Sequence, residues 1–286
     1  VPITVGLDLG DRHSHYCVLD DGSKPLEQGK VAMSPKDLAV FFQRFAPARL
    51  IMEVGGQSPW VSRLAQAAGL EVIVANPRRV QLITRNERKN DRTDAELLAR
   101  LGRVDPQLLS PVTHRSVACQ ADLAVKRARD VAVASRTALI NHVRGAIKSF
   151  GQRLPTCSPD GFHKRVLAQL PVELVPALQP IVHLIGQVTD QIKSFDARIE
   201  KLADERYPAT KLLRQVSGVG PVTALSFVLT LDTPSRVSDS RQVGPYLGLV
   251  PRTHDSGASA PQLRITKAGD PGLRRLLVIA ANYILG

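Results

Sequence analysis

The order of strand-like and helix-like segments in the first third of this 286-residue chain constrains its fold most strongly. Residues 3–9, 14–19 and 26–33 are expected to form strands, and the turn-forming run Asp20-Asp21-Gly22 predicts a meander of three strands. Helix and strand then alternate, with a helix from Ser34-Pro35 to about Phe45, a strand at 50–52, a helix near 58–68, a strand at 71–75 and a helix near 91–103. This order predicts a mixed α/β sheet.

The middle of the chain carries a helical repeat of apolar residues. They recur in alternating steps of four and three at Ile181, Ile185, Val188, Ile192, Phe195, Ile199 and Leu202. This is the heptad spacing of a coiled coil. Another helix is expected over about 116–150, and the proline-containing loop 151–161 separates the two. The pattern predicts a helical arm, either an α-hairpin or a dimerising arm, with parallel or antiparallel pairing left open.

The segment Gly218-Val219-Gly220 lies between two expected helices in the last part of the chain. It resembles the hairpin of helix-hairpin-helix DNA-binding modules, where glycines let backbone N–H groups approach a phosphate. The N-terminus of the following helix adds the positive end of its dipole. The alternative interpretation is a plain tight turn.

Charge is distributed unevenly along the chain, which carries 38 basic and 26 acidic residues and a formal charge of +12. Residues 1–112 hold 15 basic and 13 acidic residues, residues 113–205 hold 13 and 9, and residues 206–286 hold 10 and 4. We expect three domains with these bounds, and a polyanionic partner for the two more basic ones. Three widely spaced cysteines favour a reducing cytosol, and no apolar run reaches the roughly 18 residues of a membrane span.

Four acidic residues of the first domain occupy positions that suit a metal site. Asp8 lies in an apolar strand, where a buried carboxylate is costly unless a cation meets it. Glu53 follows the strand at 50–52 and precedes two glycines, while Asp91 and Asp94 are spaced to share one helix face. Each acid alone has a simpler interpretation as a turn residue or a helix cap. Together they predict an all-oxygen cage for Mg²⁺ or Mn²⁺, suited to phosphodiester chemistry.

Several segments together resemble the DEDD insertion-sequence transposases, the "one-ten" insertion-sequence family that includes the Piv DNA invertase. They are Gly6-Leu7-Asp8-Leu9-Gly10, Met52-Glu53, Lys89-Asn90-Asp91-Arg92-Thr93-Asp94-Ala95, Tyr246-Leu247-Gly248-Leu249-Val250-Pro251, Ser256-Gly257 and Ile265-Thr266-Lys267-Ala268-Gly269-Asp270. The resemblance covers nearly the whole chain. It implies an α/β N-terminal domain of RuvC-like (RNase H) fold, a helical coiled-coil arm and a mainly α C-terminal transposase domain.

The resemblance also implies chemistry and partners. The four acids map onto residues that bind Mg²⁺, and Ser256 maps onto a serine nucleophile that becomes linked to DNA. Many relatives carry Ser-Ser-Gly-Gly at this point, whereas this chain has Asp255-Ser256-Gly257-Ala258, which adds an acid beside the serine. The implied partners are double-stranded donor and target DNA, a structured noncoding guide ("bridge") RNA and further copies of the chain, as a dimer or tetramer. The implied location is the bacterial cytoplasm, at the nucleoid.

Several residues of the last domain are candidates for contact with nucleic acid. Ser259 is a rival nucleophile to Ser256, and His254 is equally well explained as a solvent-facing loop residue. Basic groups near the serine suit the charge of a phosphorane or of the DNA backbone. The candidates are Gly218, Gly220, Arg252, His254, Lys267, Arg274 and Arg275.

The predicted function is that of a Mg²⁺-dependent DNA transposase or recombinase that cuts and rejoins strands through a serine phosphodiester. The first alternative is a RuvC-like endonuclease or Holliday-junction resolvase that uses the four acids and water. Gly-Leu-Asp-Leu-Gly also opens sugar-kinase-like and actin-like ATPases, but a second phosphate loop of that kind is not recognisable in the sequence. A noncatalytic nucleic-acid scaffold is the last alternative, and it predicts that the acids are dispensable.

Overall fold

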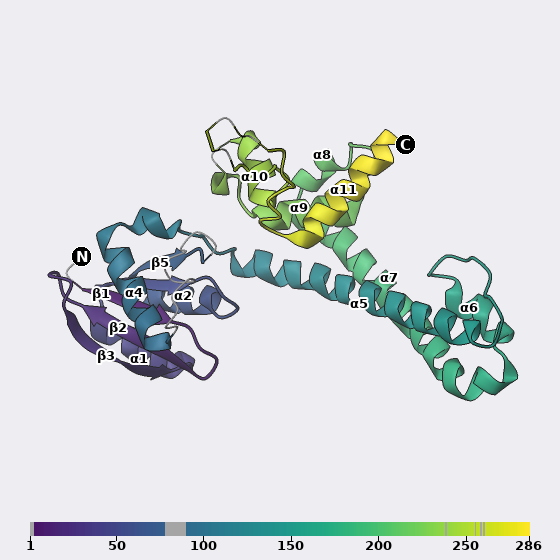
Figure 1. Ribbon diagram of the computed structural model, residues 1–286, viewed down its shortest axis with the longest axis horizontal. Coiled ribbons are helices and arrows are strands. Elements are labelled where there is room, and N and C mark those ends of the chain that lie inside the picture. Colours follow the sequence, from purple (N-terminus) through teal and green to yellow (C-terminus); the bar gives the residue numbers. More distant parts are fainter. Residues whose placement is uncertain (1–2, 78–89, 238, 255, 258, 260) are drawn as a thin grey trace. The chain divides into compact units, whose positions relative to one another are not determined.

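A computed structural model describes residues 3–77, 90–237, 239–254, 256–257, 259 and 261–286 (Figure 1). The chain divides into two compact units, Val1–Arg115 and Ser116–Gly286. The first unit contains the sheet, and the described part of the second unit is helical apart from its loops. The expected α/β N-terminal region and helical C-terminal region are therefore confirmed.

The first unit is built on a five-stranded sheet with the order β3-β2-β1-β4-β5. The strands are β1 (Thr4–Asp8), β2 (His13–Leu19), β3 (Pro25–Ala32), β4 (Arg49–Glu53) and β5 (Glu71–Ala75). The first three strands pair antiparallel, as the predicted meander requires, whereas β4 and β5 run parallel to β1. Because β1 and β4 are parallel neighbours, their carboxyl ends lie side by side at one edge of the sheet.

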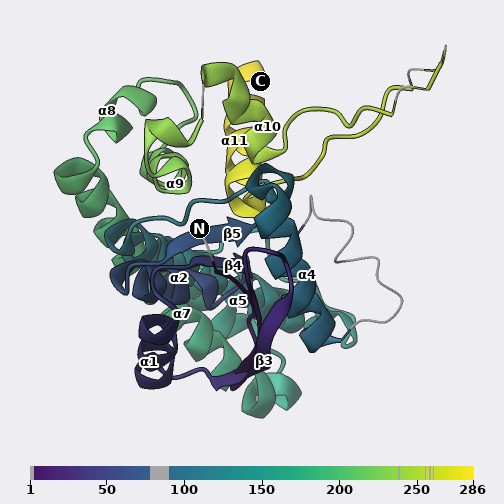
Figure 2. The ribbon, with the colours of Figure 1, turned by 90° about the vertical axis from the view of Figure 1, so that its left-hand side faces the viewer.

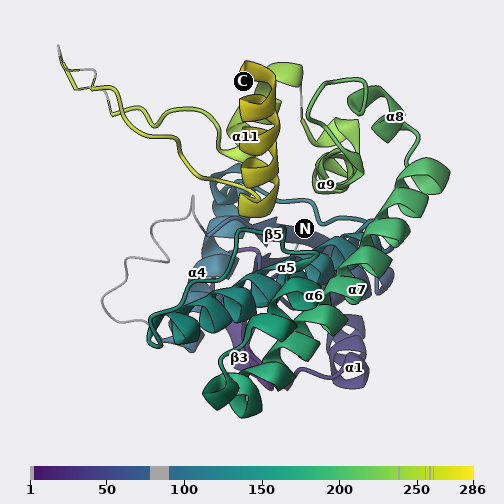
Figure 3. The same ribbon diagram turned by 90° about the vertical axis from the view of Figure 1, so that its right-hand side faces the viewer.

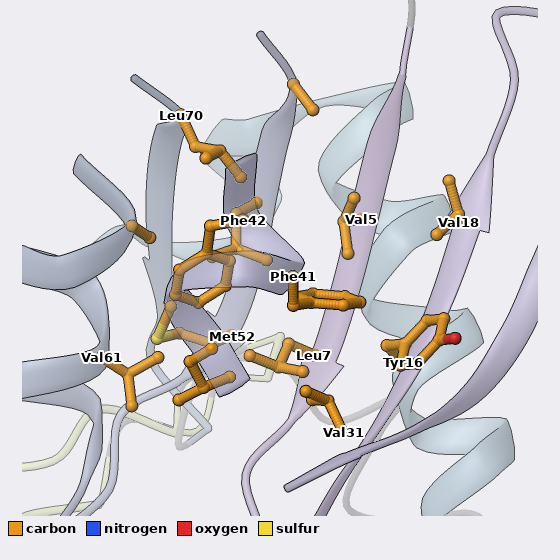
Figure 4. Packing of buried hydrophobic residues seen from close by; sticks show 14 of the residues in the cluster. Val5, Leu7, Tyr16, Val18, Val31, Phe41, Phe42, Met52, Val61 and Leu70 are labelled. Atoms are coloured by element: carbon orange, nitrogen blue, oxygen red, sulfur yellow. The ribbon is translucent and has the colours of Figure 1, made fainter. Parts of the chain in front are cut away.

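Helices cover both faces of this sheet. Alternate residues such as Val5 and Leu7 face α1 (Pro35–Phe45) and α2 (Ser58–Ala67) and form the larger core, which Figure 4 shows from close by. The intervening residues face α4 (Asp91–Val104), against which Cys17, Leu19 and Ile51 pack. The central strands β1 and β4 are buried on both faces because each face is covered, as expected inside an α/β sheet, whereas the edge strand β3 is only partly buried.

The second unit begins with a long helical hairpin. Two 32-residue helices, α5 (Val117–Lys148) and α7 (Val175–Arg206), run side by side, as Figures 1 and 3 show. An ion pair of 2.6 Å joins Arg129 to Asp196, and another of 2.9 Å joins Arg206 to Asp122, so the two helices are antiparallel. The α-hairpin alternative for the arm therefore holds within one chain.

The predicted heptad positions of α7 divide into two rows. Ile185, Ile192 and Ile199 are buried inside the second unit, whereas the positions between them are only partly buried. The turn of the hairpin contains α6 (Phe162–Val166), whose Phe162 belongs to the apolar cluster at that end. A coiled coil between chains stays a prediction.

The remaining elements of the second unit are short, and they pack near the open end of the hairpin. Apolar residues of α9 such as Leu225 and Leu229 join Leu123 of α5 and Ile199 of α7 in one cluster. These helices are α8 (Ala209–Leu213), α9 (Pro221–Leu231), α10 (Val243–Leu247) and α11 (Pro271–Leu285). Single 3₁₀ turns lie at η1 (Pro106–Leu109), η2 (Leu167–Gln169), η3 (Val172–Leu174), η4 (Pro234–Arg236) and η5 (Ser240–Gln242).

Among the described helices, none alone has both the length and the apolar character needed to cross a membrane. One bent pair, Phe162–Gln169 with Val172–Arg206, passes that test together by length and composition.

Candidate functional site

The position of α4 on the sheet is set by glycines. A Cβ atom on Gly6 of β1 would lie 2.0 Å from the carbonyl oxygen of Ala95 and 2.6 Å from the backbone nitrogen of Ala99. A Cβ on Gly102 of α4 would lie 2.2 Å from Cγ1 of Ile51 on β4. The helix therefore lies in backbone contact with β1, at a distance that a side chain at either glycine prevents.

The two strand acids lie on the face that α4 covers. Asp8 ends β1 two residues after Gly6, and Glu53 ends β4 two residues after Ile51. Because side chains alternate along a strand, each acid shares the α4-facing side with the residue two positions before it. Leu7 pairs with Met52 in the parallel register, so the two acids are the next residues along neighbouring strands. Glu53 Oε1 is buried.

The two helix acids lie in the first turn of α4. Asn90 caps the helix, because its side chain accepts a hydrogen bond of 3.1 Å from the backbone nitrogen of Arg92. Asp91 is the first helical residue, with a side chain 66% exposed, whereas Asp94 is only 5% exposed and its Oδ1 is buried. Negative charge in this turn is favoured by the helix dipole.

The direction of α4 brings its first turn to the acidic end of the sheet. Ala95 lies at Gly6, and Arg103, two turns further on, donates a hydrogen bond of 3.2 Å to the side chain of Thr4 at the start of β1. The helix therefore runs antiparallel to β1, and its N-terminus lies over the carboxyl end of that strand. All four predicted acids thus belong to one end of one face.

The four carboxylates converge without forming an assembled cage. Among the described residues, no group of three or more histidines, cysteines, aspartates or glutamates is close enough to hold a metal ion. The donor set still fits a hard cation, because all four groups supply oxygen atoms and two of these oxygens are buried. Like charges brought to one place repel each other, so a bound cation would favour their closer approach.

His15 belongs to this site, although the sequence did not single it out. It lies on β2 directly opposite Asp8 in the antiparallel register, so both side chains lie on the same face. Its Nδ1 is 3.4 Å from Oδ2 of Asp91, and its side chain is 19% exposed. The sequence does contain a signal for His15. The first two predicted strands form a hairpin, and the register of that hairpin determines which residue of the second strand faces Asp8.

Polar contacts hold the first half of α4 to the strand at the sheet edge. The side chain of Gln28 on β3 accepts a 2.5 Å hydrogen bond from Nε of Arg92 and donates one of 3.1 Å to Glu96. On the other side of the site, the amide of Gln57 donates 3.1 Å and 3.3 Å hydrogen bonds to the carbonyl oxygens of Gly10 and Asp11. The segments that follow the acidic ends of β1 and β4 are therefore tied to each other.

Ser256, the predicted nucleophile, lies in the second unit, in the long loop between α10 and α11. Its backbone exchanges two hydrogen bonds of 3.0 Å with Ser259, and both residues are exposed. Further back, Pro251 pairs with Ile265 in an antiparallel bridge, and the loop extends away from the helices of its unit (Figure 2). The rival serines are thus adjacent at the tip, while Asp255 and Ala258 lie outside the described residues.

The base of this loop is held by close backbone contacts. A Cβ on Gly248 would lie 2.2 Å from the backbone nitrogen of Ala268, and one on Gly269 would lie 2.3 Å from the carbonyl oxygen of Tyr246. Both glycines have positive φ, +68° and +69°, which a side chain would strain. Arg274 of α11 completes the base, because its guanidinium donates to the carbonyl oxygens of Leu247 and Ala268.

The other predicted contact residues of this unit lie at different places. Arg252, His254 and Lys267 are exposed along the loop, and Arg275 is exposed on α11. Arg275 is therefore accessible to a ligand at the surface of its unit. Its neighbour Arg274 is partly buried and donates hydrogen bonds to backbone carbonyl oxygens.

The predicted hairpin glycines differ in what surrounds them. A Cβ on Gly218 would lie 2.9 Å from the carbonyl oxygen of Ala280 and 3.1 Å from Tyr283, so this glycine packs on α11. Gly220 caps α9, and no described atom lies within 4 Å of the position its Cβ would take. The two glycines therefore differ: Gly218 is packed against α11, whereas the space beside Gly220 holds no described atom within 4 Å, and contact of either with a phosphate stays a prediction.

Comparison with known proteins assigns the class. Residues 5–151 match a family described as transposase, of the DEDD type of insertion sequence IS110. Residues 210–285 match a family described as transposase IS116/IS110/IS902. The protein is a DNA transposase, and the chain belongs to the IS110 family, as the sequence resemblance indicated.

Named relatives agree with this assignment over almost the whole chain. The "Probable family 20 transposase" of Pseudomonas aeruginosa is 29% identical over 98% of this chain and 83% of its own. The "Transposase for insertion sequence element IS1328" of Yersinia enterocolitica is 28% identical over 98% and 83%. The "Transposase for insertion sequence element IS1111A" of Coxiella burnetii is 26% identical over 98% and 77%.

Proposed function

We propose that this transposase cuts and rejoins DNA through a covalent serine–phosphate intermediate, with Mg²⁺ or Mn²⁺ held by the four acids of the first unit. The observation that carries the proposal is the convergence of Asp8, Glu53, Asp91 and Asp94 on one end of one sheet face. This placement is also what a RuvC-like (RNase H) fold for the first unit requires, with the acids at the carboxyl ends of adjacent parallel strands.

A divalent ion bound by these carboxylates would supply positive charge at the reacting phosphate. The residues of the chain hold the carboxylates in place. Asp8 and Glu53 are fixed by their strands, Asp94 is fixed by burial in the first turn of α4, and Asp91 is the most exposed member. Carboxylates alone repel a phosphodiester, so this end of the first unit requires a cation before DNA approaches it.

Ser256 is proposed to supply the nucleophile. Its Oγ forms a bond to phosphorus while the bond from phosphorus to the leaving deoxyribose oxygen breaks; the serine proton is lost and the leaving oxygen gains one. The phosphoserine linkage conserves a phosphate ester bond, so attack by a deoxyribose hydroxyl on another strand reverses the chemistry and rejoins DNA. Exposure at the tip of a long loop suits a group that must reach a phosphate on a large ligand.

The proposed partners are donor and target DNA, a structured guide RNA and other copies of the chain, in the bacterial cytoplasm at the nucleoid. The distribution of charge supports nucleic acid as partner, because residues 113–286 hold 23 basic and 13 acidic residues. The acids and the serine belong to different compact units. As the family resemblance implies, we propose that the acids of one subunit act with the serine of another in a dimer or tetramer.

The experiment is a comparison of Ser256→Ala, Ser259→Ala and Asp8→Asn variants on end-labelled cognate DNA, with the noncoding RNA of the element and Mg²⁺. After denaturing electrophoresis, wild type and Ser259→Ala are expected to show DNA covalently attached to protein. Ser256→Ala and Asp8→Asn are expected to show none.

The same experiment separates the alternatives. Nicking by Ser256→Ala that is lost in Asp8→Asn would replace the serine mechanism with a metal-dependent endonuclease that uses water. Full activity of Asp8→Asn would refute the role of the acids. Equal recombination with and without the RNA would remove the guide RNA from the proposal.

A further inference from the structure

We propose that His15 is a positioning residue that holds the carboxylate of Asp91 toward the strand acids, and so sets the affinity of the site for its divalent ion. This inference rests on the proposed function of the four acids. It assigns a role to a residue of β2, a strand that contributes none of those acids.

The sheet register places His15 inside the acidic end of the site. It is the antiparallel partner of Asp8, and directly paired residues project from the same face with their Cβ atoms roughly 5 Å apart. That face is the one covered by α4, because Gly6, two residues before Asp8, lies against the helix backbone. The imidazole therefore lies beside the Asp8 side chain, on the face that α4 covers, and approaches Asp91 in the first turn of that helix.

Asp91 is the acid that needs such a partner. Asp8 and Glu53 are carried by paired strands and Asp94 is buried, whereas the Asp91 side chain is 66% exposed at the first position of a helix. An exposed carboxylate samples several rotamers, and ordering it when an ion binds costs entropy. Within the described part of the site, the contact that ties it to the sheet is the 3.4 Å approach of His15 Nδ1 to its Oδ2.

The chemistry of this contact is that of a hydrogen-bond donor behind a metal-binding carboxylate. The 3.4 Å separation is an ion-pair distance, and a small rotation of the ring with its proton on Nδ1 would let it donate to Oδ2, which leaves Oδ1 of Asp91 for a cation. Outer contacts of this kind orient the groups that bind a metal, and their loss typically lowers metal affinity or activity roughly 10- to 100-fold. A pair with one largely exposed member contributes little to fold stability. We therefore expect His15 to control the affinity for the metal ion and not the stability of the fold.

The test measures Mn²⁺ binding to the full chain without DNA. Electron paramagnetic resonance reports the concentration of free Mn²⁺ during the titration. His15→Ala is expected to raise the Mn²⁺ dissociation constant roughly tenfold, with an unchanged melting temperature. His15→Asn places an amide nitrogen near the position of Nδ1 and is expected to bind almost as wild type. His15→Gln places its nitrogen near the position of Nε2 and is expected to bind as weakly as the alanine variant.

His13 provides the matched control, because it lies two residues earlier on the same strand and face and is exposed. His13→Ala should bind Mn²⁺ as wild type does. Wild-type affinity in His15→Ala, or equal affinity in His15→Asn and His15→Gln, would overturn the proposal. Asp8→Asn identifies the cause of a failure: if it lowers Mn²⁺ binding while His15→Ala does not, only the role of His15 is wrong. If Asp8→Asn leaves Mn²⁺ binding unchanged, the proposed metal site fails, and the role of His15 fails with it.

Discussion

Replacing Gly6 by alanine adds a single methyl group at the contact between β1 and α4. That methyl carbon would lie 2.0 Å from the carbonyl oxygen of Ala95 and 2.6 Å from the nitrogen of Ala99. Both atoms are backbone, so no side-chain rotation relieves the overlap. The helix must therefore move away from the strand by about 1 Å before the contact reaches a tolerable distance.

The displacement has two measurable consequences. Overpacking of this kind costs about 1–3 kcal/mol of unfolding free energy. It also moves the first turn of α4, with Asp91 and Asp94, relative to the strand acids. A misplacement of about 1 Å in catalytic groups lowers the rate roughly 100-fold. We therefore expect Gly6→Ala to fold, to melt at a lower temperature, and to lose most of its DNA cleavage even where it is fully folded.

The assay combines urea unfolding with cleavage of labelled DNA at a temperature where all variants are folded. Gly55→Ala is the matched control, because no described atom lies within 4 Å of the position of its Cβ, and it should behave as wild type. Adding Ala99→Gly to Gly6→Ala should restore neither property, since it removes only the third and weakest contact, at 3.0 Å. Wild-type stability and cleavage in Gly6→Ala would refute the reasoning, and rescue by Ala99→Gly would show that the backbone is not the obstacle.

Three further perturbations test other parts of the chain. Arg274→Gln should lower covalent DNA attachment but leave Mn²⁺ binding unchanged, because the arginine holds the base of the serine loop and not the acids. Tyr207→Phe should cost about 1.5–3 kcal/mol in urea unfolding, because the hydroxyl donates a 2.6 Å hydrogen bond to the buried carboxylate of Asp122. Glu27→Gln should flatten the loss of stability in acid: the hydrogen bond from Tyr16 lowers the pKa of Glu27, so its stabilisation is full above the ordinary value of 4.5 and is lost as pH falls below it. Unchanged attachment, unchanged unfolding or an unchanged acid titration would respectively contradict these expectations.

The pH dependence of Tyr207 has the opposite sign from that of Glu27. Burial, together with the hydrogen bond to Asp122, raises the pKa of the Tyr207 hydroxyl above its ordinary value of 10.0. The stabilisation is therefore complete below pH 10.0 and is lost as the pH rises further. The same tyrosine-to-phenylalanine variant should remove this alkaline loss, which a melting series above pH 9 measures.

Local chemistry in the sequence predicted the architecture of the first unit well. The turn residues Asp20-Asp21-Gly22 indicated the antiparallel meander, and Ser34 with Pro35 indicated the start of α1, whose cap Ser34 indeed forms by accepting from Asp37. The placement of β4 beside β1 could not be predicted from these local signals. It depends on the crossover through α1 and on packing against both faces of the sheet. The convergence of the acids follows from that placement.

Residues whose role depends on a partner far along the chain escaped sequence reasoning. The sequence around His15 has no distinguishing feature. Its proposed role comes from two contacts: it pairs with Asp8 on the neighbouring strand, and it lies near Asp91, which is 76 positions further along the sequence. Arg274 is a candidate for contact with nucleic acid because it lies beside Arg275 in a helix of a basic domain, and that contact stays a prediction. In the structure its guanidinium donates to the carbonyl oxygens of Leu247, at the end of α10, and Ala268, shortly before α11, a contact that charge alone does not reveal.

Both segments that carry the proposed chemistry are positioned by residues that have no side chain. Gly6 and Gly102 bring α4 into contact with the sheet, and Gly248 and Gly269 join the two ends of the serine loop through backbone atoms. Such contacts have no rotamers, so they define position more tightly than exposed side chains such as Ser256 are able to do. A search of the sequence for reactive groups finds the acids and the serine but not the atoms that place them. Alanine replacement of charged residues alone would likewise leave the determinants of geometry in this transposase undetected.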